Sequence, residues 1–235
     1  MKSKNKIVLI YAFVGLASLA MILFFRSLAH DVPETEVPVA SEMGKEEADW
    51  FFPIEEDLEM VRQDGETVHI SDLKGKVTVL AQFFAICPHC AVRNGAELAA
   101  IYEEFGDHPD FRMLCVTVDP ETDQREQLEA YAKVLDADPE NWWFATAGDE
   151  ALTHRYLEEE LGFFKIRERT DPVDIASNGR FAHDLGFLVI DKELNVVGKW
   201  PLPDLRSEEG KKNFPGGYER QKQEMFDRLN KELAK

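Results

Sequence analysis

A Cys-x-x-Cys motif in the first half of the chain limits the folds that this sequence can adopt. The motif, Cys87-Pro88-His89-Cys90, follows a β-rich run at 76–84 and precedes a stretch to Phe105 with apolar residues at helical spacing. A cysteine between a strand and a helix lies at the helix N-terminus, where backbone N–H groups and the helix dipole favour its thiolate. We therefore predict that Cys87 is an exposed nucleophile and that Cys90 is the buried resolving thiol.

Several kinds of chemistry are compatible with this pair of thiols. Dithiol exchange and soft-metal binding both use thiolates, and a protonated His89 would stabilise the Cys87 thiolate further. A static disulfide and half of a zinc site are the alternatives. Zinc would need a second ligand pair at short spacing, and the sequence has none. The motif therefore favours redox or soft-metal chemistry.

Strand and helix patterns alternate over most of the remaining sequence. An Asp-Gly pair at 64–65 lies between two β-rich runs and indicates a hairpin. Alternation of strands and helices is typical of an α/β sheet with helices on both faces. The expected strands are 59–62, 67–70, 76–84, 111–118, 142–145, 187–190 and 196–200, and the expected helices are about 90–105, 124–135, 150–161 and 218–235.

His183 is a candidate metal ligand. It lies in a loop shortly before the predicted strand at 187–190. In a thioredoxin-like sheet, the start of that strand lies beside the helix end that carries the two cysteines. Two thiolates and an imidazole suit Cu(I), so His183 would complete a set with Cys87 and Cys90. A loop histidine that only caps or forms a hydrogen bond is the alternative.

Other polar residues give weaker indications. Cys115 lies within the strand at 111–118 and is predicted to be a buried apolar filler, with pairing in trans as the alternative. Asp119, Glu121 and Asp123 form either a carboxylate metal cluster or an acidic turn. We favour the turn, with Asp123 as the N-cap of the next helix. Histidines without a partner pattern are predicted at the surface: His30, His69, His108 and His154.

The N-terminus predicts export to a compartment outside the cytoplasm. Residues 7–25 are a run of 19 uncharged residues, long enough as a helix to cross the hydrocarbon core of a bilayer. The lysines at positions 2, 4 and 6 should keep that end cytoplasmic. A cleaved signal peptide is the alternative, since Ser27-Leu28-Ala29 resembles a cleavage site. We expect a membrane anchor at 1–29, an acidic linker at 30–48 and a folded domain at 49–235.

The charge of the chain excludes one class of partner. The sequence has 27 Lys and Arg against 45 Asp and Glu, a formal net charge of −18. Such a surface repels phosphate backbones, so we expect no nucleic-acid partner. Metal ions and basic protein patches fit it better.

Four segments together resemble one known family. They are 64–77 leading into 83–90, the strand–DPxxD–helix region at 116–132, the tryptophan-containing segment at 141–146, and the HDLGFLVID run that starts at His183. They are similar to the SCO/SenC family of membrane-anchored copper and redox proteins that assist cytochrome c oxidase assembly. The resemblance implies a thioredoxin-like fold, with a central mixed sheet flanked by helices, and a copper site at Cys87, Cys90 and His183. It also implies a partner, either the copper-site subunit of the oxidase or another exported thiol protein.

The cysteine spacing leaves two main hypotheses. The family usually has CxxxC followed by Pro, whereas here Cys90 is followed by Ala91 and the spacing is that of dithiol oxidoreductases. The first hypothesis is a membrane-anchored periplasmic protein that passes electrons, Cu(I) or both to a respiratory oxidase. The second is a general extracytoplasmic thiol–disulfide oxidoreductase in which His183 is incidental. A redox-silent scaffold or sensor is a third, and it leaves the motif unexplained.

Overall fold

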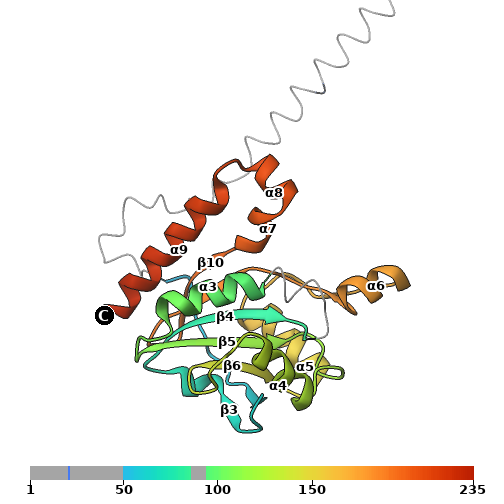
Figure 1. Ribbon diagram of the computed structural model, residues 1–235, viewed down its shortest axis with the longest axis horizontal. Helices are drawn as coiled ribbons and strands as arrows, with labels where there is room; N and C mark the ends of the chain where they lie inside the picture. The colour runs from blue at the N-terminus through green and yellow to red at the C-terminus, as the bar shows by residue number, and fades with distance from the viewer. Residues whose placement is uncertain (1–20, 22–49, 86–93) are drawn as a thin grey trace, which may run out of the picture. The chain divides into compact units, whose positions relative to one another are not determined.

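The computed structural model of the protein describes residues 21, 50–85 and 94–235. Within these ranges strands and helices alternate along the chain, as predicted (Figure 1). The strands are β1 (Phe52–Pro53), β2 (Glu59–Arg62), β3 (Thr67–His69), β4 (Val77–Phe83), β5 (Phe111–Thr117), β6 (Trp142–Thr146), β7 (Arg167–Glu168), β8 (Phe181–Ala182), β9 (Phe187–Ile190) and β10 (Asn195–Trp200). The helices are η1 (Ile70–Leu73), α3 (Gly95–Phe105), α4 (Arg125–Val134), α5 (Glu150–Arg155), the π-helical η2 (Tyr156–Glu160), α6 (Pro172–Asn178), α7 (Leu202–Arg206), α8 (Glu208–Asn213) and α9 (Gly217–Leu233).

Eight strands of the described part form one mixed sheet. Their order is β1-β10-β9-β4-β5-β6-β2-β3, while β7 and β8 pair separately. β4 is parallel to β5 on one side and antiparallel to β9 on the other. Every residue of β4 is buried, as a strand near the middle of a covered sheet requires. The predicted central mixed sheet is confirmed.

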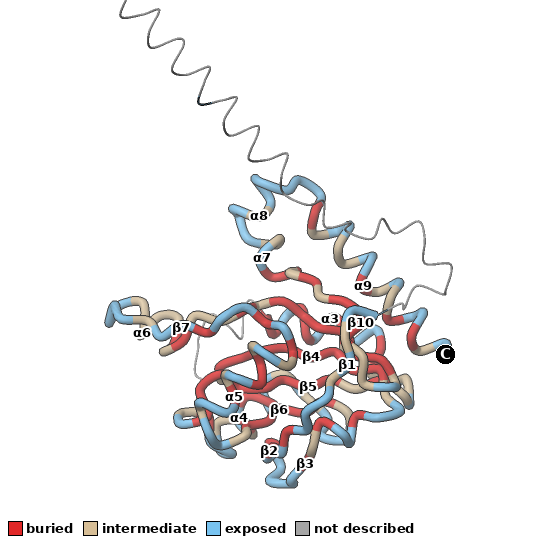
Figure 2. Tube along the Cα trace, turned by 180° about the vertical axis from the view of Figure 1, so that it is seen from behind, coloured by how far each residue is buried: buried red, intermediate tan, exposed pale blue. Residues whose placement is uncertain are grey.

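Apolar side chains cover both faces of this sheet. Successive residues of a strand point to opposite faces, so Val79 and Ala81 join one apolar cluster and Leu80 joins the other. Residues of α3, α4 and α9, among them Leu98 and Leu229, complete the first cluster. Residues of η1 and η2, among them Leu73 and Leu157, belong to the cluster on the other face. The strands at the centre are buried between the two clusters (Figure 2).

Some elements differ from the prediction. The helix expected over 150–161 changes after Arg155 from α5 to the π-helical η2. The stretch 162–180, which has no clear sequence pattern, contains β7 and α6. α3 begins at Gly95 in the described part, and its predicted start near Cys90 lies outside the described residues.

The predicted anchor and linker are not part of the described fold. Met21 aside, residues 7–25 and 30–48 lie outside the described residues. Among the residues that are described, none of the helices combines the length and the apolar character that a bilayer span needs. The anchor therefore stays a prediction.

Candidate functional site

The predicted dithiol motif follows β4 in the chain. Phe84 and Ala85 are the last residues described before it, and Cys87 and Cys90 lie outside the described residues. β4 pairs with β5 from Val77 to Phe83, so its C-terminal end is held in register up to the residue before Phe84. The chain therefore leaves the sheet toward the motif from a fixed point.

His183 lies in the segment that enters the neighbouring strand. In the antiparallel pair of β4 and β9, Ala81 lies opposite Phe187. In such a pair the chain leaves one strand and enters the other at the same end. Because His183 is four residues before Phe187, it belongs to the end of the sheet at which β4 leads to the cysteines.

The imidazole of His183 is fixed in one tautomer. Its Nδ1 lies 2.8 Å from the backbone oxygen of Asp184. A carbonyl oxygen only accepts, so Nδ1 carries the proton and donates. Burial lowers the pKa of His183 to about 4, which keeps the ring neutral near neutral pH. Nε2 therefore has a free lone pair, as in a histidine that binds a metal through Nε2.

Asp184 holds the segment that carries His183. Its side chain is 2% exposed and forms an ion pair with Lys199 of β10. The same carboxylate accepts hydrogen bonds from the backbone N–H groups of Phe164 at 3.2 Å and of Gly186 at 2.8 Å. Hydrogen bonds and ion pairs to a buried carboxylate are strong, so this carboxylate fixes the segments that donate to it. It joins the loop before β9 to the stretch 162–180.

Asp123 has a different role from the one predicted. The N-cap of α4 is Gln124, and Asp123 makes no cap bond to that helix. Its buried carboxylate accepts hydrogen bonds from the hydroxyl of Thr117 at 2.6 Å and from the backbone N–H of Ala85 at 2.8 Å. Burial raises its pKa to about 6. The predicted N-cap is therefore wrong, because the carboxylate turns inward to the chain that leads to the cysteines.

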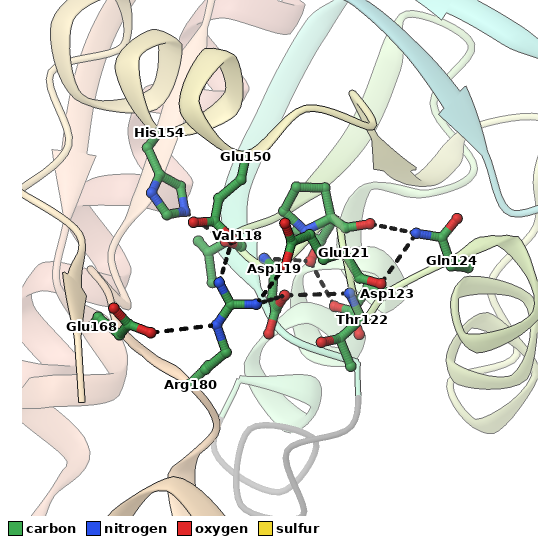
Figure 3. Close-up of polar contacts among 12 residues, drawn as sticks. Val118, Asp119, Glu121, Thr122, Asp123, Gln124, Glu150, His154, Glu168 and Arg180 are labelled. Atoms are coloured by element: carbon green, nitrogen blue, oxygen red, sulfur yellow. Dashed lines mark hydrogen bonds and ion pairs between the residues drawn. The ribbon is translucent and has the colours of Figure 1, made fainter. Parts of the chain in front are cut away.

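Arg180 connects the acidic turn to the stretch 162–180 (Figure 3). Its guanidinium forms ion pairs with Asp119 at 3.4 Å and Glu121 at 2.9 Å, and with Glu150 of α5. Glu168 of β7 lies 3.8 Å away. The turn is therefore neutralised in part by an arginine to which no local sequence pattern points. In the described ranges, no group of three or more His, Cys, Asp and Glu is arranged to hold a metal ion.

Comparison with known proteins identifies the family. The model of the SCO1/SenC family matches residues 48–211. The chain belongs to the SCO1/SenC family. The SCO1 protein homolog of Bacillus subtilis (strain 168) is 28% identical over 148 residues, which are 62% of this chain and 76% of that protein.

Solved Sco structures share the fold of this SCO1/SenC protein. BsSco, described as a member of the Sco family of cytochrome c oxidase assembly proteins, superposes with a TM-score of 0.53 at 21% identity over 65% of this chain and 85% of that one. Arabidopsis thaliana ScoI with copper bound superposes with a TM-score of 0.51 at 23% identity, over 63% and 87% of the two chains. The thioredoxin-like α/β fold is thereby confirmed.

The structure also tests the predictions made for Cys115 and for the histidines expected at the surface. Cys115 is fully buried in β5, and burial raises its pKa to about 12, so the predicted apolar filler is confirmed. His69, His108 and His154 have the same intermediate burial, so the surface prediction is met only in part for each of them. Nε2 of His154 lies 2.7 Å from the carbonyl oxygen of Val118. His30 lies outside the described residues.

The C-terminal helix α9 lies beyond the segment that matches the family. It is nevertheless tied to α3, the helix that follows the motif. Glu97 of α3 is buried and accepts hydrogen bonds from the hydroxyl of Tyr218 at 2.9 and 3.0 Å, and it forms an ion pair with Arg206 at 2.7 Å. The sequence pattern predicts the helix but not this buried cluster.

Proposed function

We propose that this SCO1/SenC protein binds Cu(I) and exchanges disulfides in the maturation of the copper site of a respiratory cytochrome c oxidase. Its proposed ligands are the thiolates of Cys87 and Cys90 and the imidazole of His183. Copper is the cargo, taken up and released by ligand exchange with target thiolates. The same two cysteines also transfer electrons to the target protein by thiol–disulfide exchange.

One observation carries the copper part of this proposal. His183 has a proton on Nδ1 and a free Nε2, and it belongs to the sheet end at which β4 leads to Cys87. Two soft thiolates with one imidazole form a donor set suited to Cu(I). The ScoI structure of Arabidopsis, which holds copper, supports the same cargo here.

The redox part uses the cysteines in sequence. The Cys87 thiolate attacks a disulfide of the target and forms a mixed disulfide, and one target thiolate leaves. Cys90 then attacks the Cys87 sulfur, which releases the second target thiol and leaves a Cys87–Cys90 disulfide. Two electrons pass to the target, and an external reductant of the thiol class must reset the pair.

We further propose where the protein acts. Residues 1–29 anchor it through the apolar run at 7–25, residues 30–48 form an acidic linker, and the domain 49–235 faces the periplasm. The proposed partner is the copper-site subunit of the oxidase or another exported thiol protein. The description of BsSco as an oxidase assembly protein supports this partner.

The cysteine spacing favours a second candidate function. Cys87 and Cys90 are separated by two residues, as in dithiol oxidoreductases. In that case the protein would reduce or oxidise exported proteins without a metal, and His183 would be incidental.

Two single substitutions test the proposal. Cys87→Ser should abolish both Cu(I) binding and reduction of a disulfide substrate, whereas Cys90→Ser should trap the mixed disulfide. Cys115→Ser is the matched control and should change neither activity, because that thiol is buried. Disulfide reduction that survives in Cys87→Ser would refute the assignment of the nucleophile. Reduction without any Cu(I) binding in the parent protein would favour the second function.

A further inference from the structure

An open cavity of about 440 Å³ lies beside His183. It is formed where the segment before β7, the loop between β8 and β9, and α7 meet. Figure 2 shows β7 and α6 extending to one side of the main sheet, with mostly exposed and half-buried surface. The lining residues are Phe164, Lys165, Arg167, Ala182, His183, Asp184, Leu185 and Asp204.

One wall of the cavity is an exposed aromatic ring held in place. Phe164 is 72% exposed, whereas its neighbours Phe163 and Ile166 are buried in the core. The ammonium group of Lys199 lies 4.1 Å from the centre of the Phe164 ring, a cation–π contact. Lys199 is itself paired with Asp184. The contact with Lys199 therefore holds the exposed Phe164 ring in one position.

The lining of the same cavity includes two cations without an ion-pair partner among the described residues, and they form its rim together with Phe164. In the described part of the chain, neither Lys165 nor Arg167 forms a salt bridge or a side-chain hydrogen bond, and both are exposed. The arginines that follow are engaged: Arg169 pairs with Asp174, and Arg180 with Glu121. In a chain of net charge −18, these two cations form a small positive patch beside the cavity.

The carboxylates in the cavity offset this charge only in part. Asp184 is paired with Lys199, and Asp204 of α7 is the other carboxylate in the lining. With Asp184 paired, the lining has two cations, Lys165 and Arg167, against one carboxylate. The rim therefore has a positive edge and an apolar edge, both beside the proposed ligand His183.

We infer that Phe164, Lys165 and Arg167 form a docking surface for an acidic segment of the target protein. The occupant is a polypeptide stretch with aspartates or glutamates beside its thiols and with an apolar side chain that packs on Phe164. Charge complementarity selects it, since opposite charges at a rim speed encounter and fix register. This inference rests on the proposed function, because it names the partner of the same site.

Matched peptides that lack cysteine test binding to the docking surface separately from disulfide exchange. The probes are two fluorescent peptides with Ser in place of each Cys, one with Glu and the other with Lys at the flanking positions. We expect the full-length protein to bind the Glu peptide more tightly, and to lose that preference as salt rises. Lys165→Glu with Arg167→Glu should weaken binding of the Glu peptide on the order of tenfold and strengthen binding of the Lys peptide.

A matched control places the same charge change elsewhere. Lys74, beside the N-terminal end of β4, and Arg220, on α9, are exposed, and Lys74→Glu with Arg220→Glu should leave the preference intact. Equal losses in the two double variants would overturn the docking surface, because they would reflect net charge alone. Phe164→Ser should weaken both peptides severalfold, and unchanged binding of both would overturn the apolar half of the surface.

The acidic linker of this chain is the other possible occupant. Changing Asp31 to Asn and Glu34, Glu36, Glu42, Glu46 and Glu47 to Gln would remove its negative charge. A gain in affinity for the Glu peptide on that change would place the linker in the cavity and overturn a partner segment as its occupant. The same affinity as in the parent would support the partner.

The proposed disulfide exchange is tested by a separate measurement of the rate of disulfide cleavage. The rate at which the reduced protein cleaves a neutral aromatic disulfide reports Cys87 alone, and it should not change in Lys165→Glu with Arg167→Glu. If the parent fails to cleave any disulfide but still selects the Glu peptide, the redox function fails and the docking surface stands. If it cleaves the neutral disulfide but shows no selection, the docking surface fails and the redox function stands.

Discussion

The carboxylate of Asp123 accepts a hydrogen bond from the backbone N–H of Ala85 at 2.8 Å. Ala85 is the last residue described before the dithiol motif. The bond therefore joins the acidic turn after β5 to the chain that leads from β4 to Cys87. The hydroxyl of Thr117 donates to the same oxygen, while the second oxygen of Asp123 is buried without a hydrogen-bond partner in the described structure.

This arrangement predicts a pH-dependent stability. The ordinary pKa of the Asp123 carboxyl is 3.8, and burial raises it to about 6 in the folded protein. As pH rises from 3.8 to about 6, the unfolded chain loses a proton that the folded protein keeps, so the free energy of unfolding falls. The expected loss from this group is on the order of 3 kcal/mol and is complete about one pH unit above the folded pKa.

Asp123→Asn isolates that contribution. The amide oxygen still accepts from Ala85 and Thr117, but the side chain no longer titrates. Denaturant unfolding from pH 3.5 to 7 should therefore show the variant gaining stability relative to the parent across this window. Two parallel stability curves would contradict the raised pKa of Asp123.

Gly179 is predicted to tolerate no side chain. Its φ is +82°, and a Cβ there would lie 2.5 Å from a ring carbon of Phe84. Gly179→Ala should lower the free energy of unfolding by about 2 kcal/mol, from backbone strain and overpacking together. Gly148→Ala is the control, since its φ is +76° but nothing lies within 4 Å of the Cβ position. Equal losses at both positions would show that Phe84 does not restrict Gly179.

The strands were predictable because their signals are local. β4 and β5 are continuous apolar runs, and β2 with β3 flank an Asp-Gly turn, so period and turn chemistry predict each element. The roles of Asp123 and Arg180 were not predictable in this way. A carboxylate just before a helix has the sequence of a cap, and only tertiary packing turns Asp123 toward Ala85. Arg180 is held by acids from three other segments, which no local pattern reveals.

The cluster of Glu97, Arg206 and Tyr218 should couple α3 to the C-terminal helices. Arg206→Met would leave the buried Glu97 carboxylate without its main cation, at an expected loss of about 2 kcal/mol. Adding Glu97→Gln removes the unpaired charge and should recover part of that loss. A double-mutant cycle measured by denaturant unfolding gives the coupling. Strictly additive losses would contradict a direct interaction between the two side chains.

α9 should be an integral part of the domain although it lies beyond the family match. Leu229 is fully buried against the sheet, so Leu229→Ala should lower the free energy of unfolding by about 2 to 4 kcal/mol. Gln223→Ala, on the exposed side of the same helix, should cost less than about 0.5 kcal/mol. Thermal unfolding of the two variants compares them directly, and similar midpoints would mean that α9 is not docked.

Cu(I) titration of the reduced protein against a competing chelator at neutral pH tests the copper site most directly. The account predicts one Cu(I) per chain and at least about tenfold weaker binding in His183→Ala, since a ligand is lost. His108→Ala, a partly exposed histidine at the turn before β5, should bind as the parent does. Equal affinity in His183→Ala and the parent, or no Cu(I) binding by the parent, would contradict the proposed site.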